Sequence, residues 1–361
     1  MERRRFGAPT VLALLAGIPL TVASTAATTA SATTTTAVTT AATASPGGHG
    51  ADHRPGYAPY FETWTRDKLP AVARASGARD LTLAFLQTPA KGSCSVTWNG
   101  DRRQPVGPGG RYVAQVRELR ARGGDVIPSF GGYSADQGGT EIADSCRSVP
   151  RIARAYESVV TTYGVTRLDM DVEANSLGNA AGIARRSAAL ALLQDWAARA
   201  QRRVQITFTL GVEPWGLPAN CLAVLKSAVA HGVRFTVNIM AFDYYIKASQ
   251  TGVQMGTAAI EALDGTHRQL GRLYPGLSQP RLWAREGITL LPGIDDYPKK
   301  TEVTYLGDTR RVARFARAHR LPLISIWAIQ RDNGGCPGTI DANSCSGIHQ
   351  PRWAFSHLLE G

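Results

Sequence analysis

The chain has 361 residues, of which 43% are apolar and 19% charged, with 37 glycines and 20 prolines. This composition is ordinary for a folded globular chain and excludes a fibrous or wholly disordered protein. The formal net charge is +12 at pH 7, but the basic residues are scattered, without a Lys/Arg block or zinc-finger spacing. We therefore do not expect nucleic acid as a partner.

The N-terminal segment has the pattern of an export signal. Three arginines at positions 3–5 precede an apolar run over 11–23, which is too short to span a membrane comfortably. We expect a signal peptide over residues 1–32, exported by either the general or the twin-arginine route. Residues 33–54 are rich in Ala and Thr and too poor in apolar bulk to fold, which predicts a disordered linker. The mature protein is then expected to be secreted, extracellular and free of the membrane.

Strand-like and helix-like segments alternate from residue 55 onward. Eight short apolar runs are typical of strands, and they cover 57–61, 81–86, 125–129, 167–173, 204–210, 235–241, 287–292 and 323–327. Apolar residues at helical spacing lie between them, for example over 152–163 and 189–200. Eight β-then-α units in about 310 residues predict an α/β protein, a single (β/α)8 TIM barrel over 55–361. A doubly wound sheet typically announces a glycine-rich nucleotide loop, and this sequence has no such motif.

Five cysteines in a chain that we expect to be exported favour disulfide bonds. Cys94 and Cys146 each follow a predicted strand, which would place both at one end of the barrel, and Cys336 and Cys345 bracket a short Gly/Pro/Asn loop. We expect these two pairs, although other pairings of the five are formally open. Cys221 then remains as a buried free thiol within a predicted helix.

Three carboxylates share one face of the fourth predicted strand. In the segment 167–173 (RLDMDVE), apolar side chains alternate with Asp169, Asp171 and Glu173. Because a strand sends alternate side chains to opposite faces, we expect the acids to point into the barrel, with Glu173 nearest its C-terminal mouth. Carboxylates on one inner face repel one another and lose solvent, so we expect raised pKa values in the set. A raised pKa suits a general acid that works near neutral pH.

Two other interpretations of the acidic segment stay open at this point. The acids could be solvated on an edge strand, or they could hold Mg²⁺ or Ca²⁺, although such an ion would want further oxygen ligands at compatible spacing. The seven histidines show no paired spacing of the H-E-x-x-H type. We expect neither a metal nor a cofactor.

The acidic segment resembles the D-x-D-x-E signature of glycoside hydrolase family 18, the chitinase barrel family, in which the Glu is the catalytic acid. Ser129-Phe130-Gly131-Gly132 is similar to the family's S-x-G-G, and the segment 240–244 is similar to its Met-x-x-Asp. Trp327 stands where the family has a tryptophan floor under the central sugar. The resemblance spans about residues 57–333. It looks closest to bacterial and archaeal secreted chitinases with a Trp-x-x-x-Arg-Asp segment, here 327–332.

The resemblance implies a secreted, endo-acting chitinase, a hydrolase of β-1,4-linked N-acetylglucosamine polymers that uses no cofactor. Chitin or its oligosaccharides would be its partners, and we expect a monomer. Two acids on one strand stand side by side, so they do not flank a sugar ring as the acid and nucleophile of an ordinary retaining enzyme do. Glu173 would therefore protonate the glycosidic oxygen while the substrate's own acetamido oxygen attacks, with overall retention. Asp171 would orient that amide, and Asp169 would share a proton with Asp171.

Further residues are expected to bind the substrate. The resemblance implies Trp327 as the floor beneath the sugar, with Met240 and Asp243 at the end of strand six. The pair at 295–296 could be a solvated loop pair, and we leave it out of the site. Three tryptophans near strand ends could line subsites or belong to the core: Trp64, Trp98 and Trp215.

Two features depart from the family pattern. An Asp and a Gly that precede the Glu by seven and six residues are here Thr166 and Arg167, which weakens the support beneath Asp169. Many members have a Tyr that holds the acetamido oxygen where Phe242 stands. Either Tyr244 supplies the phenol from a shifted position or the contact is missing.

The motifs leave two alternative functions open. An endo-β-N-acetylglucosaminidase that cuts N-glycans would use the same acids, because its substrate carries the same acetamide. A non-catalytic chitin- or carbohydrate-binding protein on the same barrel would usually lack the acid. The presence of Glu173 argues against a non-catalytic protein, whereas the departures at Thr166 and Phe242 leave that alternative open.

Overall fold

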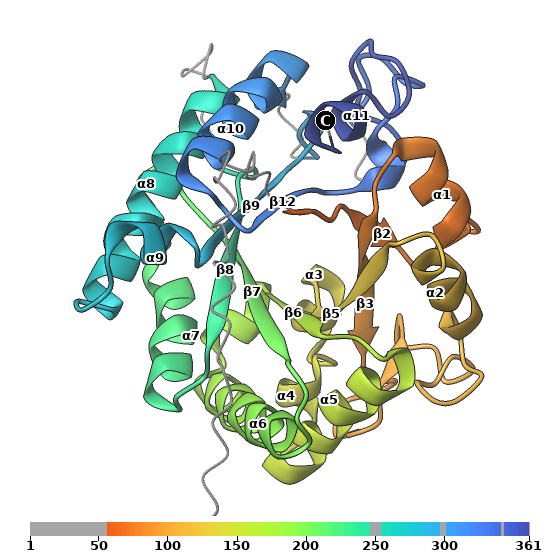
Figure 1. The fold of residues 1–361 in the computed structure, drawn as a ribbon, viewed down its shortest axis with the longest axis vertical. Coiled ribbons are helices and arrows are strands. Elements are labelled where there is room, and N and C mark those ends of the chain that lie inside the picture. The colour runs from red at the N-terminus through yellow and green to blue at the C-terminus, as the bar shows by residue number, and fades with distance from the viewer. Residues whose placement is uncertain (1–55, 246–253, 297–300, 341–342, 361) are drawn as a thin grey trace, which may run out of the picture. The chain divides into compact units, whose positions relative to one another are not determined.

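A parallel sheet curls round on itself in the computed structural model, which describes residues 56–245, 254–296, 301–340 and 343–360 (Figure 1). The strands run in the order β1 (Gly56–Tyr57), β12 (Leu323–Ile326), β9 (Glu286–Leu290), β8 (Phe235–Met240), β7 (Gln205–Gly211), β6 (Arg167–Val172), β5 (Asp125–Gly131), β3 (Asp80–Gln87) and β2 (Tyr60–Glu62). All neighbours in this order are parallel. Two short antiparallel pairings are added by β4 (Thr97–Trp98) against β3 and by β10 (Gly293–Ile294) against β11 (Val303–Thr304).

The two edges of the sheet meet on one short stretch of chain, because β1 and β2 are consecutive. The amide of Ala58 donates to the carbonyl of Ile324 at 3.2 Å, on the β12 side. The amide of Thr82 donates to the carbonyl of Pro59 at 2.9 Å, on the β3 side. Residues 56–62 therefore act as one bent first strand that closes the barrel.

The helices lie around the outside of the curled sheet, except for α3, which is drawn within the ring of strands in this view (Figure 1). They are α1 (Leu69–Ser76), α2 (Val113–Arg120), α3 (Tyr133–Gly138), α4 (Ile142–Ser145), α5 (Val149–Tyr163), α6 (Ala180–Arg199), α7 (Ala219–Ala230), α8 (Met255–Leu273), α9 (Gln279–Trp283), α10 (Leu306–His319) and α11 (Ala354–Glu360), with 3-10 turns η1 (Ala174–Gly178) and η2 (Ile329–Arg331). The eight predicted strands and the (β/α)8 order are confirmed. The fold is an α/β TIM barrel.

Helix α5 illustrates why these sequences form helices that cover the sheet. It has Pro150 in its first turn and is followed by Gly164, which adopts the left-handed conformation (φ 61°) that glycine favours at this position. Ile152 and Tyr156 lie on its apolar face and are fully buried. That face meets the outer surface of the sheet, where Met170 is 1% exposed. The main core is therefore the layer between sheet and helices.

Both predicted disulfides are confirmed, between Cys94 and Cys146 and between Cys336 and Cys345. Cys221 is a free, buried thiol on α7, as expected. Burial raises the pKa of that thiol to about 12, so it stays protonated and chemically inert at neutral pH.

The signal peptide predicted over 1–32 and the linker over 33–54 lie outside the described residues. None of the helices within the described ranges is long and apolar enough to cross a membrane.

Candidate active site

Strand β6 carries the three predicted acids to the C-terminal mouth of the barrel. Its apolar residues, Leu168, Met170 and Val172, are at most 1% exposed on the helix side, so the alternate residues face the barrel interior. Glu173 comes directly after the strand and keeps an extended backbone (φ −133°, ψ −176°), which continues the alternation. The inward orientation of the acids follows the sequence pattern.

Asp169 is the deepest of the three acids and receives three hydrogen bonds from side chains. Its carboxylate accepts from the hydroxyls of Ser129 at 2.6 Å, Thr209 at 2.7 Å and Tyr60 at 2.9 Å. Burial raises the pKa of Asp169 to about 6, and these donors oppose the rise by stabilising the anion. Ser129 belongs to the S-x-G-G segment, whereas the parts played by Tyr60 and Thr209 were not predicted from the sequence.

Asp171 lies above Asp169 in a less favourable environment for an anion. It is 3% exposed, and its Oδ1 has no hydrogen-bond partner within the described part of the chain. Burial raises its pKa well above the usual value, and the negative charges of Glu173, Asp169 and Asp136 add to the rise. Asp171 therefore holds a proton more readily than an ordinary aspartate, and its Oδ1 has no partner among the described residues.

Glu173 is half-buried at the mouth and titrates close to neutrality. Burial raises its pKa to about 7, a hydrogen bond from the backbone of Tyr133 lowers it, and the charge of Asp296 raises it. A carboxyl group with a pKa near the working pH can both give and take a proton, which a general acid and base requires.

The S-x-G-G segment lets the β5–α3 turn come into contact with β6. Gly131 has a φ of +97°, and a Cβ there would lie 2.1 Å from the carbonyl oxygen of Asp171. Gly132 has a φ of +82°, and a Cβ there would lie 2.5 Å from the ring of Phe85. The amide of Gly132 donates to the Asp171 carbonyl at 3.1 Å. Only glycine permits this approach at both positions.

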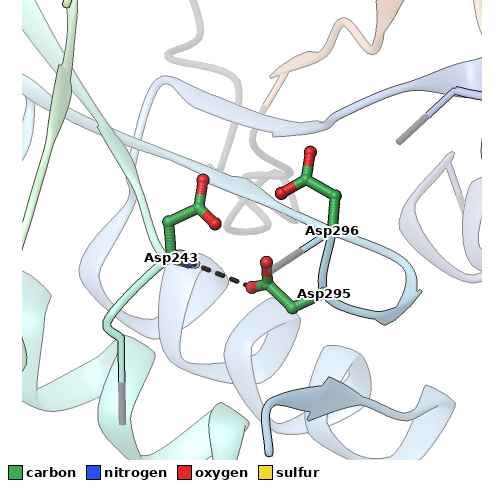
Figure 2. A group of neighbouring side chains, drawn as sticks. All are labelled: Asp243, Asp295 and Asp296. Carbon is green, nitrogen blue, oxygen red and sulfur yellow. Dashed lines mark hydrogen bonds between the residues drawn. The ribbon is translucent and has the colours of Figure 1, made fainter. Parts of the chain in front are cut away.

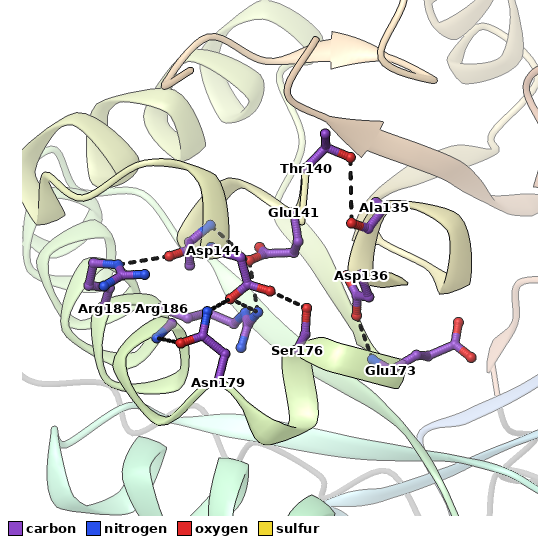
Figure 3. Close-up of polar contacts among 12 residues, drawn as sticks. Ala135, Asp136, Thr140, Glu141, Asp144, Glu173, Ser176, Asn179, Arg185 and Arg186 are labelled. Carbon is purple, nitrogen blue, oxygen red and sulfur yellow. Dashed lines mark hydrogen bonds and ion pairs between the residues drawn. The ribbon is translucent and has the colours of Figure 1, made fainter. Parts of the chain in front are cut away.

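A buried acid that sequence reasoning missed lies behind Glu173. Asp136, on α3, is 0% exposed and accepts a hydrogen bond from the Glu173 amide at 2.5 Å (Figure 3). Burial raises its pKa well above the usual value, and the charge of Glu141 adds to this rise. The only signal in the sequence is an acid placed four residues after Gly132, a spacing that belongs to none of the motifs quoted above.

An aromatic cluster lies beside the acids. The Trp327 ring stacks on Phe85 with centroids 5.5 Å apart and an interplanar angle of 11°, and it lies 5.5 Å from the Tyr60 ring. Trp327 is half-buried at the end of β12, which fits a platform for a sugar ring. Trp64, 45% exposed, lies 6.2 Å from Trp327 and extends this surface.

The other two candidate tryptophans differ in exposure. Trp98 is fully buried and donates its indole hydrogen to the hydroxyl of Tyr163 at 2.8 Å, so it belongs to the core and not to a subsite. Trp215 is 60% exposed after β7.

Asp243 lies in a cluster of three carboxylates with two acids that follow β10 (Figure 2). Oxygen atoms of Asp243, Asp295 and Asp296 all lie within 4.8 Å of one another, and the Asp243 amide donates to Asp295 at 3.0 Å. Burial, together with the charges of Asp295 and Asp296, raises the pKa of Asp243 to about 9. The interpretation of 295–296 as a solvated loop pair is wrong for Asp295, which is 2% exposed.

Among the described residues, these three carboxylates have a spacing that would suit a divalent cation. A cation would offset the repulsion between the three negative carboxylates, and a proton shared among them does the same. The raised pKa of Asp243 favours the shared proton. The expectation that the reaction needs no metal stays a prediction.

The end of β8 places its two tyrosines differently from the sequence expectation. Met240, the last residue of the strand, is half-buried. Tyr244 is 6% exposed, its amide donates to Glu302 at 3.0 Å, and its hydroxyl is buried without a hydrogen-bond partner among the described residues. Tyr245 is 59% exposed, so it offers the solvent-facing phenol of this segment. The expected contact of Tyr244 with substrate is therefore not supported by the geometry.

Known proteins that are similar to this chain include chitinases, which agrees with the barrel and its inward acids. No protein-family model matches the chain. A probable bifunctional chitinase/lysozyme of Escherichia coli is 31% identical over 84% of this chain and 34% of its own length. Endochitinase 11 of Metarhizium anisopliae is 31% identical over 76% of this chain and 52% of its own length. The chain thus spans about a third and about half of these curated relatives.

A solved structure extends the likeness to the fold. Active domain 2 of the thermostable chitinase from Pyrococcus furiosus, in catalytic-site mutants complexed with chito-oligosaccharides, superposes with a TM-score of 0.71 at 28% identity, covering 86% of this chain and 96% of that one. In sequence and fold, this TIM barrel with inward acids at the end of its fourth strand is therefore similar to chitinases. This likeness agrees with the resemblance of the sequence motifs to glycoside hydrolase family 18.

Proposed function

We propose that this protein is a secreted chitinase, which hydrolyses β-1,4-linked N-acetylglucosamine polymers within the chain and retains the anomeric configuration. The observation that carries the proposal is the arrangement of acids on β6, where Glu173, with a pKa of about 7, lies above Asp171, whose pKa is raised by burial. The names of the relatives, which are those of chitinases, support the substrate class. The proposal that the protein is secreted rests on the signal-peptide pattern of residues 1–32. We also propose that it acts as a monomer without a cofactor.

The geometry of β6 favours a nucleophile supplied by the substrate. Asp171 and Glu173 are two residues apart, which corresponds to a rise of roughly 7 Å along the strand, and their side chains point to the same side. An ordinary retaining enzyme needs a carboxylate on the face of the ring opposite the acid. Neither acid reaches that face while the other protonates the leaving oxygen. The 2-acetamido oxygen of the sugar can do so from within the substrate.

The first chemical step follows from these positions. Glu173 gives its proton to the glycosidic oxygen, and the bond between that oxygen and the anomeric carbon breaks with its electron pair leaving on the oxygen. The acetamido oxygen forms a bond to the anomeric carbon, which produces an oxazolinium ring. Asp171 accepts a hydrogen bond from the N–H of that ring and passes its own proton to Asp169, which its three hydroxyl donors keep ionised and therefore able to take it.

The second step returns the enzyme to its starting state. Glu173, now ionised, takes a proton from a water molecule, and the resulting hydroxide attacks the anomeric carbon on the face from which the product left. The bond to the acetamido oxygen breaks, the amide is restored, and the proton passes back from Asp169 to Asp171. Two displacements at one carbon give overall retention.

The experiment is cleavage of N-acetylglucosamine hexamer by residues 55–361, with products separated by size and their first-formed anomer identified by proton NMR. We expect short oligomers of the β anomer and a loss of roughly a hundredfold or more in Glu173→Gln. The matched control is Glu157→Gln, which changes a half-buried glutamate on α5 and should leave cleavage unchanged.

Three results would contradict the proposal. An α anomer formed first would exclude the substrate-assisted scheme. A protein that binds the hexamer but cleaves nothing, with the same behaviour in Glu173→Gln, would be a carbohydrate-binding protein. Cleavage restricted to the core of N-glycans would define an endo-β-N-acetylglucosaminidase.

A further inference from the structure

The backbone at Glu173 lies outside the hydrogen-bond ladder that holds the other two acids. The last paired residue of β6 is Val172, opposite Leu210 on β7. Glu173 therefore has an amide with no strand partner, directly at the point where the chain turns into η1. That amide donates to the Oδ2 atom of Asp136 at 2.5 Å, so a side chain takes the place of the missing strand (Figure 3).

Asp136 is itself held closely against β6. Its amide donates to the carbonyl of Gly132 at 3.0 Å, and the Gly131-Gly132 turn brings α3 into contact with the Asp171 backbone. A Cβ at Gly131 would lie 3.2 Å from the Oδ1 atom of Asp136 and 2.1 Å from the Asp171 carbonyl. The carboxyl group is therefore packed between the turn and the strand, and it is 0% exposed.

A second carboxylate holds the other end of η1. Asp144, on α4, accepts from the side-chain amide of Asn179 at 2.9 Å and from the hydroxyl of Ser176. The fully buried Arg186 forms an ion pair at 2.8 Å with Glu141, whose carboxylate also accepts the amide of Asp144 at 3.1 Å. The chain on the C-terminal side of the general acid is thus fixed independently of Asp136.

These contacts leave one clear task for the buried Asp136. We propose that Asp136 is a positioning residue for the reaction: its carboxyl oxygen fixes the main-chain N–H of Glu173 and thereby aims the Glu173 side chain at the glycosidic oxygen. This inference rests on the proposed function for the role of Glu173. It needs an acceptor oxygen at position 136 and does not need a negative charge there.

A small error in aim is costly in catalysis. Misplacing a reacting group by about 1 Å can cost on the order of a hundredfold in rate. Substrate that binds to the aromatic surface at Trp327 does not depend on the Glu173 main chain. Loss of the Asp136 oxygen should therefore lower kcat and leave KM nearly unchanged.

The test compares Asp136→Ala with Asp136→Asn. Alanine removes the acceptor, whereas the Oδ1 atom of asparagine can accept the same N–H without carrying charge. We expect kcat on the hexamer to fall about 10- to 100-fold in Asp136→Ala with KM within about twofold, and to stay within about threefold of wild type in Asp136→Asn. Asp80→Ala is the matched control, because Asp80 accepts the amide of Asp125 at 2.9 Å at the opposite end of the strands.

A readout that does not depend on activity accompanies the kinetics. Amide hydrogen exchange in the peptide that contains Glu173 should speed up in Asp136→Ala and stay slow in Asp136→Asn and Asp80→Ala. Unchanged exchange in Asp136→Ala would overturn the inference whether or not the wild type cleaves chitin oligomers. An Asp136→Asn variant that folds and is as impaired as Asp136→Ala would also overturn it, because the role would then depend on the acid and not on the acceptor.

Discussion

Tyr60, on the first strand of the barrel, donates a hydrogen bond of 2.9 Å to Asp169 on the fourth, across the barrel interior. Its ring also lies 5.5 Å from the ring of Trp327. One buried side chain therefore contacts both the acids at the base of the site and the aromatic platform at its mouth. A substitution of Tyr60 should therefore affect both Asp169 and the position of the Trp327 ring.

The first prediction concerns Tyr60→Phe, which keeps the ring and removes the hydroxyl. Asp169 loses one of its three donors, so its anion becomes less stable and its pKa rises. More of the enzyme then already carries a proton on Asp169 and cannot take the proton of Asp171. We expect kcat to fall about tenfold, because a hydrogen bond to a charged group contributes about 1.5–3 kcal/mol. Steady-state kinetics on the hexamer measure this. Tyr163→Phe is the control, since it removes a phenol hydrogen-bonded to Trp98 in the outer core and should lower stability without lowering kcat per folded molecule.

The second prediction is a bell-shaped dependence of kcat/KM on pH. Activity should fall as pH rises above about 7, because Glu173 must carry its proton. It should also fall as pH drops below about 6, because Asp169 must be ionised in order to accept the proton of Asp171. In Asp296→Asn the basic limb should move to lower pH, since the negative charge that raises the Glu173 pKa is removed. The exposed Asp195→Asn on α6 should leave both limbs in place. A basic limb that does not move in Asp296→Asn would contradict this assignment.

The alternation along β6 was sufficient to predict which way its residues point. Leu168, Met170 and Val172 could only be buried against helices, and this fixed the inward direction of the acids. The S-x-G-G segment could also be recognised in the sequence, and the structure shows that its glycines are needed because the close approach of two backbones excludes a Cβ.

Other parts of the site depend on contacts that no local pattern encodes. Tyr60 and Thr209 contact Asp169 from strands that are 109 and 40 positions away in sequence. Asp295 is buried because the turn after β10 packs against the end of β8, where its carboxylate accepts the Asp243 amide. Such placements follow from the closure of the barrel, and a single sequence offers no periodicity that would reveal them.

The third prediction concerns the cost of burying Asp171. A carboxyl group whose pKa is raised in the folded state is protonated there over a pH range in which the unfolded chain has lost its proton. Stability contributed by this group is therefore complete below the unfolded pKa and is lost as pH rises toward the folded pKa. Asp171→Asn removes that loss, so we expect a higher melting temperature than wild type at pH 8, a gain that shrinks toward pH 4, and little remaining activity.

Thermal unfolding followed by circular dichroism at several pH values measures this difference. Asp195→Asn again serves as the control, because an exposed carboxyl group should show no pH-dependent gain. A melting temperature of Asp171→Asn below that of wild type at pH 8 would mean that the ionised carboxylate has partners that stabilise it in the fold.

The fourth prediction separates two tryptophans that look alike in the sequence. Trp64 is exposed beside Trp327, whereas Trp98 is held in the core by β4, which folds back on β3, and by its hydrogen bond to Tyr163. An aromatic contact contributes about 1 kcal/mol, so Trp64→Ala should raise KM for the hexamer about fivefold with kcat unchanged. Trp98→Phe should lower the melting temperature and leave KM unchanged, because it breaks a buried hydrogen bond away from the cleft. If Trp64→Ala left KM as in wild type, the sugar chain would have to pass the acids without reaching this side of the aromatic cluster.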